Sequence, residues 1–215
     1  MTEVYSADKR VKKSRLALQR ALLDLLKSSP FEDITITEIV QHADVNRGTF
    51  YNNYQDKQQL LEEIMQDVLS DLLKAYRRPY INETKFEVHR IQAGAIEIFR
   101  HVADHANFYR VVLGSNSLPG FQYKIYSFLR NIPLQDLIYP YHEDRAGVGA
   151  SAGGTGDKAA GADYELWCSF YASGLIGMIG YWVENDFAQS HEYMAEQLVA
   201  LINGQSRLFM LTKMD

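Results

Sequence analysis

The chain has 215 residues, of which 47% are hydrophobic and 23% are charged. This composition is typical of a globular protein and excludes an intrinsically disordered chain. The length allows one long domain, or a small domain joined to a larger one. The formal net charge of −5 at pH 7 excludes an overall positive field that would attract nucleic acid. Any DNA-binding surface therefore has to be a local basic patch.

A basic patch of this kind lies near the N-terminus. Residues 9–20 contain no acidic side chain and six basic ones, which are Lys9, Arg10, Lys12, Lys13, Arg15 and Arg20. Residues 1–57 carry nine Lys and Arg against eight Asp and Glu, whereas the remainder carries thirteen against nineteen. The N-terminal end is therefore predicted to face anions.

Apolar residues recur at helical spacing along almost the whole chain, and no segment alternates as a strand does. We therefore expect an all-α fold. The expected longer helices cover residues 9–28, 57–76, 88–102, 121–132, 167–182 and 194–209. Pro119 suits the first turn of the fourth of these helices, and Pro133 is expected to kink or end it.

Two segments interrupt the helical pattern. Six Gly and six Ala among the seventeen residues 146–162 predict a flexible loop. Residues 77–85, which include Pro79 and a polar run, form a second break. Because one helix near residues 57–76 can link two parts, we place an N-terminal helix-turn-helix domain at residues 1–56 and a larger C-terminal helical domain at residues 57–215.

Helix-start signals follow one another closely in the N-terminal part. Thr35 and Glu38 form a capping box that begins a short helix through residue 43. Asp44 stands at a sharp turn, where Asp is one of the few residue types that tolerate a left-handed backbone. Asn46 is a good N-cap for a second short helix at residues 47–54. Two short helices joined by such a turn are the helix-turn-helix pattern.

The second short helix carries residue types that recognise DNA. Val45, Phe50 and Tyr54 are suited to pack inward. The remaining positions face outward: Arg47, Gly48, Thr49, Tyr51, Asn52 and Asn53. Arg can pair with guanine, Asn with adenine, and Thr can contact the thymine methyl group. Gly48 lets the backbone approach DNA closely, while Tyr51 and Asn53 have the reach for phosphates. Lys57, beside the N-terminal amides of the next helix, is a predicted phosphate contact.

The run from Ala43 to Lys57 resembles the DNA-binding signature of the TetR family of bacterial regulators. That signature has an Ala-Gly-Val turn, a Ser-x-Gly-Thr-Leu-Tyr-x-His-Phe recognition helix and a Lys-started fourth helix, and Asp44, Asn46 and Asn53 replace its usual Gly, Ser and His. The resemblance implies base contacts from Arg47, Gly48, Thr49 and Asn52. It implies phosphate contacts from Thr35, Tyr51, Asn53 and Lys57. It also implies that a basic arm, residues 9–15, follows an adjacent groove or phosphate row.

The C-terminal part carries no catalytic signature, since it has neither a Gly-rich phosphate loop nor a nucleophile elbow. His101 and His105 have a spacing that metal ligands use, but no third ligand accompanies them, so we predict no metal site. The single cysteine, Cys168, excludes an intrachain disulfide, suits a reducing compartment and is expected to be inert in its apolar run. We therefore expect a cytoplasmic protein that is not an enzyme and holds no cofactor. A polar, basic start without an apolar stretch fits that location.

Residues 166–183 form an apolar run of eighteen residues without a charge, which is near the length of a membrane span. Small residues within the run and the flanking Glu165 and Glu184 favour a helix buried on all sides instead. A face where another backbone can approach is marked by Gly174, Gly177 and Gly180. The resemblance implies that the last two long helices pair across a two-fold axis into a four-helix bundle.

The resemblance to the TetR family implies a homodimeric repressor that binds a pseudo-palindromic double-stranded DNA operator and leaves it when a small-molecule effector binds the C-terminal part. Aromatic residues crowd that part, which suits a pocket but equally suits an ordinary core. The alternative is a protein of the same shape that has lost DNA binding and works through a protein partner. The nearly balanced charge of residues 1–57 and the acidic Asp44 allow this alternative, and the outward face of residues 47–53 disfavours it.

Overall fold

The computed structural model describes residues 2–83, 87–114, 120–137 and 163–204. Within these residues the regular structure is helical throughout, as predicted. The elements are α1 (Thr2–Leu25), α2 (Ile36–His42), α3 (Arg47–Tyr51), α4 (Lys57–Arg77), the 3₁₀ turns η1 (Val88–Arg90) and η2 (Ala93–Ala95), α5 (Ile98–Asp104), α6 (Ala106–Leu113), α7 (Phe121–Asp136), α8 (Tyr164–Glu184) and α9 (His191–Ile202).

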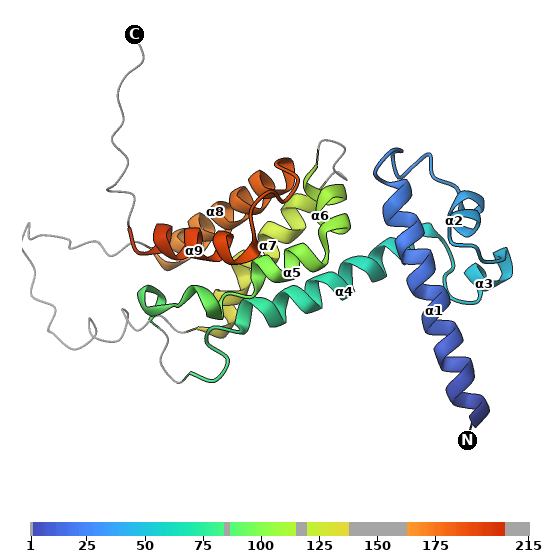
Figure 1. Ribbon diagram of the computed structural model, residues 1–215, viewed down its shortest axis with the longest axis horizontal. Coiled ribbons are helices and arrows are strands. Elements are labelled where there is room, and N and C mark those ends of the chain that lie inside the picture. The colour runs from blue at the N-terminus through green and yellow to red at the C-terminus, as the bar shows by residue number, and fades with distance from the viewer. Residues whose placement is uncertain (1, 84–86, 115–119, 138–162, 205–215) are drawn as a thin grey trace, which may run out of the picture.

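Helix α4 connects two parts of the molecule (Figure 1). Helices α1 to α3 form a head at one end, and α5 to α9 form a body around the other half of α4. In the head, Leu22, Ile39 and Phe50 are fully buried, together with Leu60 near the start of α4. In the body, Leu72 near the other end of α4 is equally buried. One helix thus contributes to the hydrophobic core of both parts.

The helix starts in the head follow the predicted caps. The Thr35 hydroxyl accepts a hydrogen bond from the Glu38 amide (3.2 Å), and the Glu38 carboxylate accepts one from the Thr35 amide (2.8 Å). Asp44 has a φ of 53°, which is the left-handed conformation predicted for the turn. The Asn46 side chain accepts a hydrogen bond from the Thr49 amide (2.7 Å) and begins α3.

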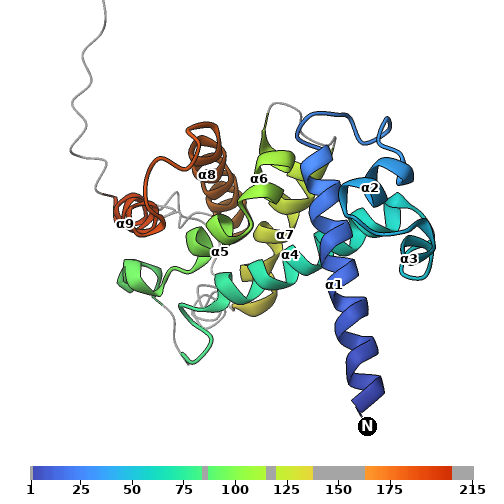
Figure 2. The same cartoon turned by 45° about the vertical axis from the view of Figure 1, so that its right-hand side comes forward.

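The bounds of two helices in the head differ from the prediction. Helix α1 begins at Thr2 rather than at residue 9, since residues 2–8 contain neither Pro nor Gly to interrupt a helix. Its first half therefore projects beyond the packed head as a helical arm, residues 2–13 (Figure 2). Helix α3 ends at Tyr51 rather than at residue 54, and α4 begins after Asp56, whose side chain accepts a hydrogen bond from the Gln59 amide (2.8 Å).

The helix predicted over residues 88–102 is broken. The two turns η1 and η2 precede α5, which begins only at Ile98. Ile91 and Ile96, which follow the turns, have extended backbones with ψ of 128° and 103°. β-Branched residues adopt this conformation readily, and Gly94 weakens a helix at this place. In this segment the apolar spacing identifies residues that face inward, but it does not show that the backbone is helical.

Helix α7 contains Pro133 and continues to Asp136, so it does not end at the proline. The Pro133 carbonyl accepts hydrogen bonds from the Leu137 amide and the Tyr164 hydroxyl, at 3.0 Å each. These bonds hold the last turn of α7 against the first turn of α8. The predictions for Pro119, for the loop 146–162 and for residues 205–209 lie outside the described residues.

Helix α8 is only partly buried, so the expectation of a helix covered on all sides is wrong for the single chain. Leu166, Phe170 and Tyr181 are 66%, 72% and 57% exposed, whereas Ile179 and Trp182 are buried. Among the described residues, α8 is the one helix that is long and apolar enough to cross a membrane by length and composition, and 33% of that window is buried. The sequence shows that α8 is apolar, but it does not show whether the same chain or another molecule covers its apolar face.

His101 is a buried polar residue of the body. Its Nε2 lies 3.1 Å from the Tyr109 hydroxyl, and its ring lies 4.5 Å from the ring of His105. Burial, with a smaller effect of His105, lowers the pKa of His101 to about 4. The described residues contain no group of three His, Cys, Asp or Glu that could hold a metal ion. Cys168 is buried, and burial raises the pKa of its thiol, as in an unreactive cysteine.

The pKa of His101 predicts that acid weakens the fold. Because the folded-state pKa of about 4 lies below the ordinary value of 6.5, the unfolded chain binds the proton more readily. This contribution to stability is complete above pH 6.5 and falls by about 3 kcal/mol as the pH drops through the folded-state pKa. We expect His101→Gln, which keeps a polar group beside Tyr109, to flatten the pH dependence of the unfolding free energy measured by urea titration. The surface change His42→Gln is the control, and an equally steep dependence in His101→Gln would contradict the prediction.

Candidate nucleic-acid interface

Helix α3 is held in the head by its inner face. Phe50 is fully buried, and Tyr54 just beyond the helix is 2% exposed. The Tyr54 hydroxyl donates a hydrogen bond to the Glu63 carboxylate on α4 (2.8 Å). Helix α3 has only five residues, so this packing fixes its orientation more than its own hydrogen bonds do. The opposite face of α3 is therefore exposed to solvent in a fixed orientation.

That outer face contains four of the predicted contact residues, all exposed: Arg47, Gly48, Tyr51 and Asn52. The Arg47 guanidinium lies 5.7 Å from the centre of the Tyr51 ring, and its Nη2 lies 3.3 Å from the Tyr51 hydroxyl. This contact orients the guanidinium and leaves most of its five N–H donors available to a base or a phosphate.

Three other predicted residues make hydrogen bonds within the head. The Thr49 hydroxyl donates to the Asn46 side-chain oxygen (3.0 Å), and the Asn53 amide donates to the Thr49 carbonyl (2.7 Å). The Thr35 hydroxyl donates to Glu38 within the cap of α2 (2.7 Å). Thr49 and Asn53 are half-buried and Thr35 is exposed. The DNA contacts of these three residues therefore stay predictions, and each residue also stabilises a helix start or a helix end.

The residue at position 48 is constrained by the same cap. A Cβ atom at Gly48 would lie 3.3 Å from the Asn46 side-chain oxygen that caps α3. A larger residue would press on this oxygen, so Gly48 preserves the start of the helix, and its close approach to DNA stays a prediction.

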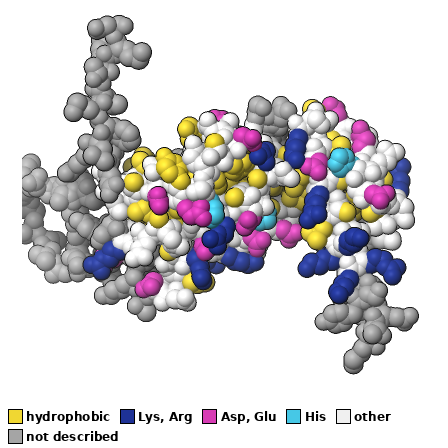
Figure 3. Space-filling view, in the orientation of Figure 1, with side chains coloured by type: hydrophobic (Ala, Val, Ile, Leu, Met, Phe, Trp, Pro, Cys, Tyr) yellow, Lys and Arg dark blue, Asp and Glu magenta, His cyan; other side chains and the backbone are white. Residues whose placement is uncertain are grey.

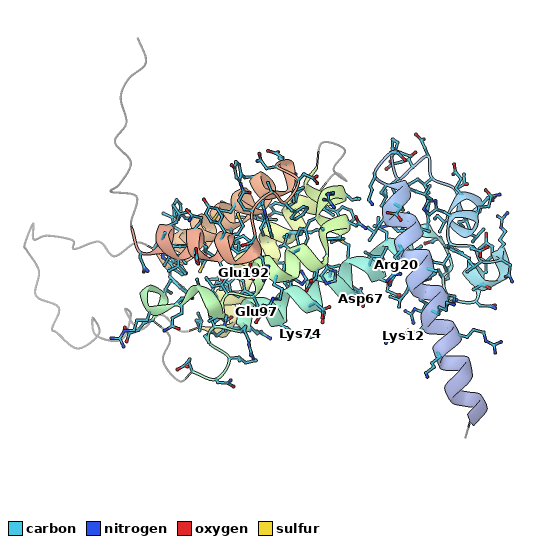
Figure 4. All side chains as sticks on the ribbon, in the orientation of Figure 1. Lys12, Arg20, Asp67, Lys74, Glu97 and Glu192 are labelled. Carbon is cyan, nitrogen blue, oxygen red and sulfur yellow. The ribbon has the colours of Figure 1, made fainter. Side chains whose placement is uncertain are left out.

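An open groove of about 870 Å³ separates the arm of α1 from the turn between α2 and α3. Its walls are formed by Arg10, Val11, Lys13, Ser14 and Ala17 on one side and by Ala43, Asp44, Val45, Asn46, Thr49, Asn52 and Asn53 on the other. Lys and Arg side chains gather on the arm (Figure 3), and Lys12 projects from it (Figure 4). A basic wall opposite amide side chains suits a phosphodiester strand.

Arg15 does not extend this basic wall, although the predicted arm includes it. Its Nε donates to Glu63 Oε1 on α4 (3.1 Å), and a second nitrogen pairs with the other carboxylate oxygen. Gln19 donates to Glu63 Oε1 as well (3.0 Å). The bond to Glu63 is the main cause of a raised pKa of Arg15. Arg15 therefore holds α1 against α4, a role that the sequence did not indicate.

Lys57 also has a position that differs from the predicted phosphate contact. Its Nζ donates to the carbonyl oxygens of Phe31 (2.6 Å), Glu32 (2.8 Å) and Ile34 (2.7 Å). An ammonium group has three donors, and these bonds use all of them. In this geometry Lys57 fixes the loop before α2 and has no donor left for a phosphate.

Two family models match the sequence. The model described as "Bacterial regulatory proteins, tetR family" matches residues 20–64, which include α2, α3 and the start of α4. The model described as "Transcriptional regulator C-terminal region" matches residues 89–204, more than half of the chain. The chain belongs to the TetR family. It is therefore a DNA-binding transcriptional regulator.

Curated relatives agree with this assignment. The HTH-type transcriptional regulator YxbF of Bacillus subtilis (strain 168) is 24% identical over 195 residues, which are 90% of this chain and 46% of YxbF. The HTH-type dhaKLM operon transcriptional activator DhaS of Lactococcus lactis subsp. lactis (strain IL1403) is 32% identical over 56 residues, which are 26% of this chain and 30% of DhaS. The chain thus spans less than half the length of either relative in these matches.

Solved structures share the fold. The dihydroxyacetone kinase operon activator DhaS has a TM-score of 0.54 at 17% identity, with 91% of this chain and 97% of that chain covered. A TetR transcriptional regulator from Streptococcus agalactiae 2603V has a TM-score of 0.52 at 18% identity, with 93% and 98% covered. At these identities the likeness shows the arrangement of helices and nothing about ligands.

Lys57 at the start of α4 and Lys13 in the groove wall are expected to respond differently to substitution. Lys57→Met removes three hydrogen bonds to carbonyl groups, so it should lower the unfolding free energy by about 1–3 kcal/mol. It should leave unchanged the slope of log K for DNA binding against log salt concentration. Lys13→Met should leave the melting temperature unchanged and reduce the size of that slope by about 0.9, the loss of one phosphate contact. A reduced slope in Lys57→Met would instead establish a direct phosphate contact for Lys57.

Proposed function

We propose that this regulator is a cytoplasmic homodimeric repressor that binds a pseudo-palindromic DNA operator and leaves it when a small molecule binds in the body. Each protomer would insert α3 into a major groove, and the two copies would lie roughly 34–36 Å apart, one turn of DNA. The base contacts are assigned to Arg47, Gly48, Thr49 and Asn52. The phosphate contacts are assigned to Thr35, Tyr51, Asn53 and the arm.

The observation that carries this proposal is the two-sided character of α3. Its inner face is anchored by the buried Phe50, while Arg47 and Asn52 are exposed on the outer face. An arginine can bind two guanine acceptors and an asparagine can pair with adenine in the major groove. The basic groove beside the arm adds a place for one strand of the DNA backbone.

The exposed face of α8 supports the dimer. Leu166, Phe170, Gly174, Gly177 and Tyr181 follow at spacings of four, four, three and four residues, so they form one stripe on the helix. A Cβ atom at either glycine would meet nothing within 4 Å. A second copy related by a two-fold axis would cover this stripe with its own α8 and α9 and remove the apolar surface from water.

Helix α4 supports the coupling between effector and operator. Its start packs in the head through Leu60 and Leu61, and its end lines a cavity in the body through Tyr76. An effector changes operator affinity only if it binds one orientation of α4 better than another. We propose that the effector lowers the affinity of the protein for its operator. The protein represses transcription when this operator overlaps the promoter. The relative DhaS is named an activator, and a reporter gene behind the bound promoter distinguishes the two directions.

A partner-binding protein without DNA affinity is the second candidate. Asp44 is exposed on the rim of the groove and would place a negative charge near phosphates. Under this alternative the chain would fold and dimerise normally but show no specific affinity for DNA. The outer face of α3 favours the regulator.

A gel-shift assay with the promoter beside the protein's own gene tests the proposal. We expect specific binding that weakens steeply with salt, because several phosphates are contacted. The double variant Arg47→Ala/Asn52→Ala should weaken binding at least tenfold, since each base contact contributes about 1–3 kcal/mol. Its melting temperature should stay unchanged because both side chains are exposed. Unchanged binding would contradict the base contacts, and no shift by the unmodified protein would favour the second candidate.

The dimer is tested by Gly177→Arg. The new side chain meets open space within the protomer, so the protomer should fold normally. At the proposed seam it would collide with the partner's helix and bury a charge, which should raise the dimer dissociation constant at least tenfold, about 1.4 kcal/mol. Sedimentation equilibrium measures this change, and Gln122→Arg on the exposed side of α7 is the matched control. A dimer of unchanged affinity in Gly177→Arg would place the interface elsewhere.

A further inference from the structure

The body contains a cavity of about 100 Å³ beside the last turn of α4. Its walls come from α4, α7, α8, α9 and the segment before α5. The aromatic and proline residues of the wall are Tyr76, Pro79, Tyr80, Pro133, Trp167 and Tyr171, and the others are aliphatic. No lining residue is acidic, basic or a histidine. The cavity is therefore an apolar site with a few neutral polar groups at its wall.

Two charged side chains next to lining residues, Arg77 and Asp136, neutralise each other. Arg77 forms two hydrogen bonds of 2.6 Å with the Asp136 carboxylate, and the Tyr80 hydroxyl donates to the same carboxylate (2.9 Å). The bond to Arg77 holds the pKa of Asp136 below its ordinary value, so the pair stays charged and closed at neutral pH. A charged ligand in the cavity would find no free counter-charge in this cluster and would lose its hydration.

Neutral hydrogen-bond donors are present in the wall. Tyr76 OH, Trp167 Nε1 and Tyr171 OH have no hydrogen-bond partner among the described residues. Burial raises the pKa of Tyr76, so its hydroxyl stays protonated and can donate. The ring centroids of Trp167 and Tyr171 lie 4.4 Å apart with their planes inclined at 42°, so the α8 side of the wall is aromatic but not flat. An oxygen acceptor on a ligand would satisfy the Tyr76 hydroxyl.

The volume limits the size of the ligand. An engineered cavity of about 150 Å³ in another protein accommodates benzene. The present cavity is of the same order, so it holds one ring or a short alkyl chain, with little space for a second ring.

We propose that this cavity binds an uncharged molecule of about one-ring size that carries a hydrogen-bond acceptor, which the Tyr76 hydroxyl contacts. This inference rests on the proposed function and names the chemical class of its effector. The site also explains the coupling, because Ala75, Tyr76, Pro79 and Tyr80 belong to the end of α4 and the turn after it. A ligand that fills the cavity acts directly on the helix that carries the head.

Three compounds of similar shape test the proposal on the full-length protein by titration calorimetry and melting temperature. Acetophenone is neutral and has a carbonyl acceptor, ethylbenzene is neutral and has none, and benzoate is charged. We expect both neutral compounds to bind and to raise the melting temperature with concentration. Benzoate should bind at least about 30-fold more weakly than acetophenone, because its charge would be buried without a partner.

The variant Tyr76→Phe removes only the hydroxyl. It should weaken acetophenone binding roughly two- to tenfold, the effect of one lost hydrogen bond, and leave ethylbenzene binding unchanged. Tyr123→Phe, at an exposed tyrosine on α7 outside the cavity, is the control and should change neither. A loss of affinity for acetophenone alone would indicate a direct contact between the Tyr76 hydroxyl and the ligand. A loss of affinity for both neutral compounds would indicate a general loss of stability.

The proposal is overturned if benzoate binds as tightly as acetophenone, if Tyr76→Phe leaves acetophenone binding unchanged, or if neither neutral compound binds at about 1 mM. These results are independent of the gel-shift assay. Arg47→Ala/Asn52→Ala should bind acetophenone with unchanged affinity, so a failure of DNA recognition and a failure of the effector class are distinguishable.

Discussion

The Glu63 carboxylate is the interaction on which the geometry of the head depends. It accepts hydrogen bonds from Arg15 and Gln19 on α1 and from Tyr54 beyond α3. Burial raises the pKa of Glu63, but the bonds from Arg15 and Tyr54 outweigh burial and leave it below its ordinary value. The group therefore stays ionised at neutral pH, and one charge on α4 fixes both the basic arm and the recognition helix. Any reorientation of α4 therefore carries the arm and the recognition helix with it.

The sequence predicted those parts of the head that depend on neighbours three or four residues apart. The capping box of Thr35 and Glu38, the left-handed Asp44 and the cap Asn46 are local arrangements, and all three are found. The pair of Arg15 and Glu63 joins residues 48 positions apart, so no spacing rule indicates it. For this reason the sequence assigned Arg15 to DNA, although it completes the packing of α1 on α4.

The body shows a second limit of sequence patterns. Apolar spacing correctly marked inward residues such as Ile91, but the pattern does not distinguish a helix from turns that expose the same faces. The exposed stripe of α8 and the cavity beside Tyr76 depend on which elements meet in space. The cavity wall combines five separate segments, and its lack of charge becomes evident only when they are assembled. Aromatic content alone could not separate a filled core from a small site.

The length of α4 would allow a ligand in the proposed site of about 100 Å³ to affect DNA binding. The helix has 21 residues and is about 30 Å long. A tilt of about 5° at its body end therefore moves its head end by about 2–3 Å. In a two-fold dimer both heads move, so the separation of the recognition helices changes by up to about 5 Å, more than the 3.4 Å step between base pairs. Because Arg77 and Asp136 tie the end of α4 to α7, such a tilt requires α7 to move as well. The ligand must therefore bind more tightly to one combined arrangement of α4 and α7, and α4 transmits that arrangement to the head.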